Sequence, residues 1–161
     1  MYLERHYQNA YVTPDINRAI EAMKAQYGLT DADVLYTEAT TPVWTPNGSG
    51  PNTSKLAFIW VGKLQYELIE PVSGPSDLYS AAVDPDQLLR FHHVAMRVMD
   101  WDAFRAAVDK QKHPVVIEGE GGGGLKFLYL DARDTLGHYL EYVYAPPEFW
   151  ARMDPNGATE V

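Results

Sequence analysis

The sequence contains no cysteine, and this absence removes several kinds of chemistry before any motif is considered. Disulfide frameworks, zinc sites held by thiolates and thiol nucleophiles are all excluded. A metal ion in this protein would therefore take its ligands from histidine, glutamate, aspartate or amide oxygen, and that set favours borderline or hard divalent ions.

Long apolar runs and an excess of positive charge are also missing. No stretch is long enough to span a bilayer, and residues 1–6 lack the apolar core of a signal peptide, so we expect a cytoplasmic protein. The formal charge is −9 at pH 7. Because nucleic acids and anionic membranes bind basic surfaces, neither is an expected partner. The 161 residues suffice to bury a substantial core in one compact unit.

Apolar periodicity indicates a first series of elements in the N-terminal half. A strand is expected at 6–13, followed by a helix that Asp15 caps and Gly28 ends. Three further strands are expected, at 34–38, 56–61 and 64–70. The region 40–54 is rich in proline, glycine, asparagine and serine, and we expect it to be a loop.

The same order of elements returns after a connector that contains two prolines. A strand at 90–98 leads to Asp100, which matches Asp15 as the start of a helix. The remaining predicted elements are strands at 114–118, 125–131 and 139–144 and a short helix at 147–153. The glycine-rich segment 119–124 is interrupted by a glutamate and lacks a following Gly-Lys-Ser/Thr, so it predicts a mobile flap over a cavity and not a phosphate-binding loop.

This internal repeat predicts an α+β fold made of two βαβββ modules whose curved mixed sheets enclose a cavity. Matching segments such as Tyr66-Glu67-Leu68 and Leu140-Glu141-Tyr142 support it. The expected division within one compact domain is a first module at 1–71, a connector at 72–89, a second module at 90–145 and a C-terminal tail at 146–161.

Three short motifs are the sharpest pieces of the repeat: Phe91-His92-His93-Val94-Ala95, Tyr66-Glu67-Leu68-Ile69-Glu70-Pro71 and Gly137-His138-Tyr139-Leu140-Glu141-Tyr142-Val143. Together with the two modules, they resemble the vicinal oxygen chelate superfamily. That superfamily includes glyoxalase I, methylmalonyl-CoA epimerase, extradiol dioxygenases and bleomycin-resistance proteins. The resemblance covers about residues 6–144. It implies a divalent ion (Zn, Ni, Co, Mn or Fe) with one ligand from the first and last strand of each module.

Carried over to this chain, the resemblance implies four ligand positions. His93 and Gln8 each stand seven residues before a helix-capping aspartate, where the first-strand ligands belong. Glu67 and Glu141 occupy the last-strand positions. Gln8 departs from the histidine that is common there, although glutamine is an oxygen ligand elsewhere in the family. Independently, two carboxylates among apolar neighbours at matching places are costly to bury unless they are paired or bound to a metal.

Each residue also has a purely structural explanation. Glu67 and Glu141 could lie on a solvated sheet face, His93 could be a hydrogen-bonded core residue, and Gln8 could simply line a pocket. We expect His92 to be structural, because neighbouring strand residues point to opposite faces. Four further residues are expected to shape a pocket for an apolar or aromatic substrate: Tyr11, Trp60, Tyr129 and His138.

Three functions follow from these expectations. The first is a lyase or isomerase, in which the metal stabilises an enolate of a small oxygen-bearing substrate and Glu141 or Glu67 is the base. The second is a non-catalytic protein that binds a small molecule, as drug-resistance relatives do. The third is an extradiol-type dioxygenase, but the two histidines which that site requires are reduced to one because Gln8 stands in the first strand. Many relatives pair, so a homodimer is expected.

Overall fold

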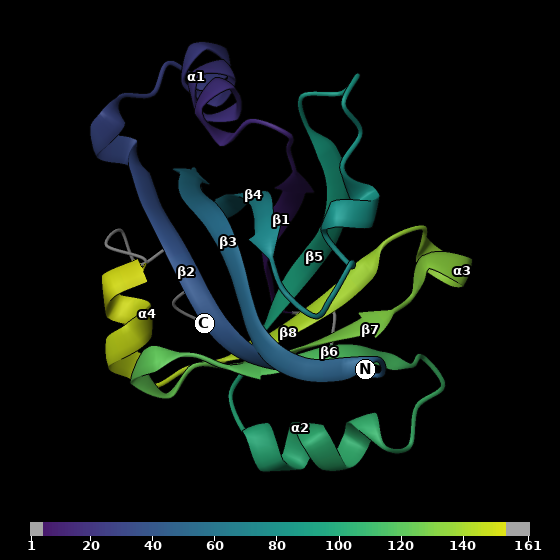
Figure 1. The fold of residues 1–161 in the computed structure, drawn as a ribbon. Coiled ribbons are helices and arrows are strands. Elements are labelled where there is room, and N and C mark those ends of the chain that lie inside the picture. The colour runs from purple at the N-terminus through teal and green to yellow at the C-terminus, as the bar shows by residue number, and fades with distance from the viewer. Residues whose placement is uncertain (1–4, 154–161) are drawn as a thin grey trace.

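A computed structural model describes residues 5–153 and shows eight strands closed into a barrel in the order β1-β4-β3-β2-β6-β7-β8-β5 (Figure 1). The first module consists of β1 (His6–Val12), α1 (Ile16–Tyr27), β2 (Val34–Thr45), β3 (Gly48–Val61) and β4 (Leu64–Ser73). The second consists of β5 (Arg90–Val98), α2 (Trp101–Val108), β6 (Val115–Glu120), β7 (Lys126–Asp131) and β8 (Tyr139–Tyr144). The remaining helices are α3 (Arg133–Leu136), α4 (Pro147–Met153) and the 3-10 turns η1 (Asp31–Asp33), η2 (Ser80–Ala82) and η3 (Gly122–Gly124). The predicted α+β fold of two βαβββ modules is confirmed.

The barrel closes because the two modules pair through their first strands. β1 and β5 run antiparallel, while each pairs in parallel with the last strand of its own module, β4 or β8. On the other side, β2 and β6 pair over only two positions. Adjacent strands β4, β1, β5 and β8 carry, in that order, Glu67, Gln8, His93 and Glu141.

Both long helices begin where the sequence predicts. The side chain of Asp15 accepts a hydrogen bond from the backbone N–H of Arg18 at 3.0 Å, and Asp100 accepts one from Ala103 at 2.9 Å. Gly28 ends α1 with φ 67°, a left-handed conformation that glycine adopts without strain. The helices bury their apolar faces against the outside of the barrel, which leaves its interior free. No helix among residues 5–153 combines the length and the apolar character needed to cross a bilayer.

The prediction of a loop at 40–54 is wrong. β2 and β3 instead form a long curved hairpin that turns at 46–47 and sweeps across the barrel (Figure 1). Cross-strand pairs hold this extension, including the hydroxyls of Thr40 and Thr53 at 2.9 Å. Pro42 and Pro51 lie directly opposite one another. They are tolerated because neither position is paired on its outer side: β2 pairs with β6 only at Val43 and Trp44, and the pairing of β3 with β4 begins at Thr53.

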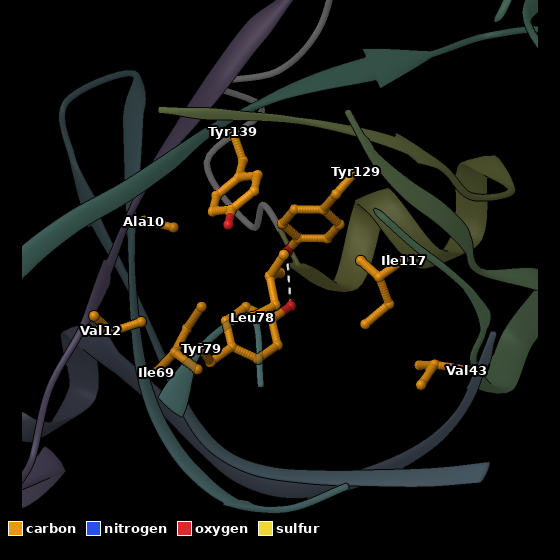
Figure 2. Packing of buried hydrophobic residues seen from close by; sticks show 9 residues of the cluster. All are labelled: Ala10, Val12, Val43, Ile69, Leu78, Tyr79, Ile117, Tyr129 and Tyr139. Atoms are coloured by element: carbon orange, nitrogen blue, oxygen red, sulfur yellow. Dashed lines mark hydrogen bonds between the residues drawn. The ribbon is translucent and has the colours of Figure 1, made fainter. Parts of the chain in front are cut away.

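The connector between the modules enters the barrel. Leu78 and Tyr79 are 8% and 9% exposed, and both belong to a buried cluster that includes Ala10 and Ile69. Figure 2 shows Tyr79 inside the barrel, with its hydroxyl aimed at that of Tyr129. The connector thus contributes to the interior of the barrel.

Candidate active site

A cavity of about 600 Å³ occupies the interior of the barrel. Its wall is formed mainly by apolar side chains, among them Leu56, Phe58, Ile117, Phe127 and Trp150. Leu35 on β2 also lines the cavity and is 48% exposed, so the cavity opens to solvent along this strand. Concave, mostly apolar cavities of this size are typical of sites for small molecules.

Glu67, His93 and Glu141 form a buried cluster at this cavity. Both glutamates line it, and His93 lies between them with 0% of its surface exposed. Nε2 of His93 is 3.1 Å from Oε2 of Glu141 and 3.5 Å from Oε2 of Glu67. The three side chains each offer one ligand atom, and these atoms all lie within 4.8 Å of one another. The structure therefore brings together three of the four residues that the sequence singled out as ligands.

Small side chains leave room at the centre of this cluster. Ala10 on β1 is the register partner of both Glu67 on β4 and His93 on β5. Ala95 on β5 is likewise opposite Glu141 on β8. Both alanines are 0% exposed. A larger side chain at either position would fill the space into which the polar groups converge.

The fourth predicted ligand, Gln8, lies in the same cavity wall and is 2% exposed. Its Nε2 donates a hydrogen bond to Oε1 of Gln65 at 2.7 Å, which fixes the orientation of the amide. Its Oε1 is buried and has no hydrogen-bond partner among the described residues. A buried acceptor without a partner is costly, so this oxygen is suited to a ligand that the protein itself does not provide.

The two carboxylates control the charge of His93. Burial by itself lowers the pKa of this imidazole, but the hydrogen bonds and charges of Glu141 and Glu67 outweigh burial and raise its pKa to about 9. Burial raises the pKa of Glu67, and the hydrogen bond from His93 opposes that effect. Without a metal ion, the imidazolium therefore neutralises part of the acidic charge at neutral pH.

His92 fixes which nitrogen of His93 carries a proton. Burial lowers the pKa of His92 to about 3, and the neighbouring His93 adds to this effect, so His92 is neutral. Its Nε2 lies 3.1 Å from the carbonyl oxygen of Leu78, which can only accept, so Nε2 holds the proton. Its bare Nδ1 then accepts from Nδ1 of His93 at 2.9 Å. Nε2 of His93 consequently faces the carboxylates as the nitrogen available to a metal ion.

A pair of buried tyrosines borders the same centre. Tyr79 donates a hydrogen bond to the hydroxyl of Tyr129 at 3.0 Å, and that hydroxyl lies 3.4 Å from Nε2 of His93. Burial raises the pKa of both phenols well above the ordinary value, and the charge of Glu141 acts in the same direction. Both phenols are therefore neutral, and because Tyr79 donates its proton to Tyr129, the hydroxyl of Tyr129 is the donor available at the cavity.

Of the residues expected to shape the pocket, only Tyr129 lies in the cavity wall. Tyr11 packs on the outside of the barrel against Tyr66, with ring centroids 6.1 Å apart. The indole N–H of Trp60 donates to the carbonyl of Met153 at 2.8 Å, and His138 hydrogen-bonds the carbonyl of the next residue at 2.8 Å. These three expectations are corrected. Tyr11 lies on the outer face, since strand alternation alone does not say which face of a closed barrel is the inner one. Trp60 shares the face of Phe58 but its indole is held by the end of α4, and His138 lies in the turn before β8.

Sequence reasoning missed three residues that support the cluster. His92 was expected to point away, but its Nδ1 contacts His93. Gln65 could have been found from strand alternation, which places it on the same face of β4 as Glu67. Tyr79 carried no signal of its own, because it is one of several apolar residues in the connector.

The donor set fits a divalent metal ion. It combines two carboxylates, one imidazole nitrogen and an amide oxygen without a partner, all of them buried. Oxygen and imidazole donors of this kind suit Mn, Fe, Co, Ni or Zn. A backing hydrogen bond on the ligand histidine, here from His93 to His92, is a usual feature of protein metal sites.

Comparison with known proteins agrees with this architecture. The model of the glyoxalase/bleomycin resistance protein/dioxygenase superfamily matches residues 7–129. No curated protein sequence gave a match.

Several solved structures share the fold. Methylmalonyl-CoA epimerase from Mycobacterium tuberculosis has a TM-score of 0.58 at 17% identity, with 94% of this chain and 96% of that chain covered. A variant of the Streptomyces coelicolor enzyme in complex with 2-nitronate-propionyl-CoA has a TM-score of 0.58 at 20% identity, with 91% and 97% covered. A hypothetical protein from Bacillus halodurans C-125 has a TM-score of 0.59 at 16% identity, with 88% and 94% covered. At these identities the likeness concerns the fold.

Proposed function

Because the chain belongs to the glyoxalase/bleomycin resistance protein/dioxygenase superfamily, we propose that it is a metal-dependent isomerase or lyase. It would remove a proton beside a carbonyl group of a small oxygen-bearing substrate. The observation that carries the proposal is the buried Glu67–His93–Glu141 cluster at the wall of the cavity. The epimerases among the similar structures support an isomerase.

The roles follow from the surroundings of each residue. Glu67, His93, Glu141 and Gln8 would hold a divalent ion, which supplies Lewis acidity to the oxygens of the substrate. Glu67 is our first choice of base, because its carboxylate lies 3.5 Å from Nε2 of His93 and that of Glu141 only 3.1 Å, so Glu67 is the less firmly held of the two. Glu141 is the alternative base, since it lines the same cavity. Tyr129 can donate its phenolic proton to an oxygen that becomes negative during the reaction.

Metal content tests the site first. The purified protein is stripped with a chelator, reloaded with Mn, Co, Ni or Zn, and analysed for metal per chain. We expect about one ion per chain in the wild type and loss of binding in His93→Ala and Glu141→Ala. Gln8→Leu should bind more weakly, by roughly tenfold, because it removes one of the four donors. Unchanged metal content in His93→Ala and Glu141→Ala would contradict the proposed site.

Proton abstraction is tested by exchange in D₂O. The loaded protein is incubated with a panel of carbonyl compounds, including methylmalonyl-CoA, and NMR follows deuterium entering the position beside the carbonyl. Glu67→Gln should keep the metal and lose exchange if Glu67 is the base, whereas Glu141→Gln should do so if Glu141 is. Exchange that persists in both variants would contradict a carboxylate base from this pair.

A second candidate function is a binding protein without catalysis. It is favoured by the metal-free cluster being internally paired, with the His93 imidazolium between two carboxylates. Ligand binding that is equally tight with a chelator present, together with no exchange across the panel, would favour this candidate.

A further inference from the structure

We propose that the substrate is largely apolar and carries no charge apart from the oxygens that meet the metal, so that esters of coenzyme A are excluded. This inference rests on the proposed function for the position of those oxygens. The proposed substrate differs from the ligand of a structural relative, a methylmalonyl-CoA epimerase solved in complex with methylmalonyl-CoA. The argument uses the charges around the cavity, the character of its wall and the state of the nearby cations.

The described wall of the cavity contains three carboxylates and no lysine or arginine. The carboxylates are Glu67 and Glu141 at the centre and Glu120 at the rim, where its side chain is 72% exposed. The residues outside 5–153 add no lysine or arginine either, since none occurs among them in the sequence. An anionic group that entered this cavity would lose water and meet no positively charged side chain in the wall, which is strongly unfavourable. The imidazolium of His93 in the metal-free protein is already paired with Glu67 and Glu141.

The metal centre does not supply the missing positive charge. Two carboxylates, Glu67 and Glu141, balance the charge of one divalent ion, so the loaded centre is neutral before substrate enters. An oxygen pair can still replace water there, but a separate phosphate or carboxylate elsewhere on the substrate gains nothing from a neutral centre.

Cations beside the lining residues are already engaged. Arg97 lies over the ring of Trp150, with 4.5 Å between the guanidinium carbon and the ring centroid. Lys126 lies 3.9 Å from Glu120 in an ion pair. Arg152 lies over the ring of Phe149, with 6.0 Å between the guanidinium carbon and the ring centroid. A nucleotide diphosphate is usually held by several cations or by backbone N–H groups at a helix N-terminus, and no such cluster lines this cavity.

The rest of the wall favours an apolar body. Apolar side chains of several strands contribute, including Leu56 and Phe58 of β3, Ile117 of β6, Phe127 of β7 and Val143 of β8. Polar lining on the side of β2 comes from threonines such as Thr37 and Thr41, which are uncharged. A planar apolar molecule with two adjacent oxygens matches the acidic, metal-binding end and the apolar walls together.

A matched pair of probes tests the charge rule, which is the exclusion of negatively charged groups from the cavity. 2,3-Dihydroxynaphthalene and its 6-sulfonate share one ring system and one vicinal oxygen pair, and they differ by a single negative charge. Isothermal titration is done with the chelator-treated protein and with the loaded protein, and coenzyme A is the third probe. We expect the uncharged diol to bind, the sulfonate to bind at least about tenfold more weakly, and coenzyme A not to bind. Equal affinity for diol and sulfonate, or tight binding of coenzyme A, overturns the proposal.

Adding a cation to the wall should reduce or remove the preference for the uncharged diol. Thr37 is exposed and lines the cavity, so Thr37→Arg introduces a guanidinium there with little cost to folding. It should improve binding of the sulfonate by about tenfold and leave the diol within about twofold. Tyr36→Arg is the control: it adds the same charge one residue away, on an exposed side chain outside the cavity lining. Equal gains in both variants, or no gain in Thr37→Arg, overturn the proposal.

Failure here can be told apart from failure of the proposed function. The charge rule is measured in chelator-treated protein, so a protein that holds no metal would contradict the proposed function and leave the probe preference intact. Conversely, normal metal content with an affinity for coenzyme A as high as for the diol would contradict only the substrate class.

Discussion

Nδ1 of His92 lies 2.9 Å from Nδ1 of His93, so two adjacent residues of one strand share a hydrogen bond through their rings. The carbonyl of Leu78 fixes its direction, because it takes the only ring proton of His92. The bond therefore both positions the ring of His93 and leaves its Nε2 facing Glu67 and Glu141. The surroundings of this centre predict the outcome of experiments on its backing histidine, its response to pH, its small side chains and its tyrosine pair.

The first concerns His92 as a positioning residue. His92→Phe removes the acceptor for His93, and metal affinity should fall roughly 10- to 100-fold, as it does when backing partners of ligand histidines are removed. His92→Gln is the matched control, since its amide can donate to Leu78 and accept from His93. Titration calorimetry with Zn or Co measures both variants. Wild-type affinity in the phenylalanine variant would show that the pair has no such role.

The second concerns pH. Because Glu141 and Glu67 hold the pKa of His93 at about 9, a metal ion must displace a proton from its Nε2 below that pH. Metal affinity should rise by about tenfold per pH unit and level off above pH 9. Calorimetry in buffers of different ionisation enthalpy counts the released protons, and we expect about one per ion from His93. Affinity that does not change between pH 6.5 and 8.5 would be inconsistent with this charge state.

The same shift predicts how pH affects the metal-free protein. The pKa of His93 is raised from its ordinary value of 6.5 to about 9. Its stabilising contribution is therefore complete below pH 6.5 and is lost as pH rises through 9. Urea denaturation should show this loss in the wild type and not in His93→Asn.

The third concerns the small side chains at the centre. Ala10→Val and Ala95→Val should each abolish metal binding, because the added methyl groups occupy the space between the converging donors. Ala57→Val is the control, since Ala57 is equally buried at 0% exposure but lies beneath α1. All three variants should lose about 1–3 kcal/mol of stability from overpacking. Metal analysis beside thermal denaturation separates the two effects, and metal retained in the first two variants would argue against the space being the metal position.

The fourth concerns the hydrogen bond of 3.0 Å between Tyr79 and Tyr129. Tyr129→Phe leaves the hydroxyl of Tyr79 buried without its acceptor and should cost about 1–3 kcal/mol of unfolding free energy. The double variant with Tyr79→Phe should cost little more than the single one, which gives a coupling of about 1 kcal/mol. Tyr139→Phe, in the same cluster, is the control. Strictly additive losses would mean that the two hydroxyls do not stabilise each other.

Much of the fold was predictable because its signals are local. Asp15 and Asp100 each cap a helix within their own turn, and Gly28 ends α1 by its own backbone conformation. The bounds of β5 and β8 agree with the predicted strands at 90–98 and 139–144. Residues 40–54 were misjudged because pairing between β2 and β3 outweighed the turn-forming tendency of proline and glycine.

The sequence by itself determined the two modules and the strand positions of Glu67, His93, Glu141 and Gln8, since strand order and alternation are written along the chain. Only the tertiary structure decided their setting. The orientation of Gln8 depends on Gln65, 57 residues away, and the tyrosine pair joins residues 50 apart. The cavity and its lack of a cation likewise arise from side chains of distant strands. Such contacts are set by how the barrel closes, and no local pattern records them.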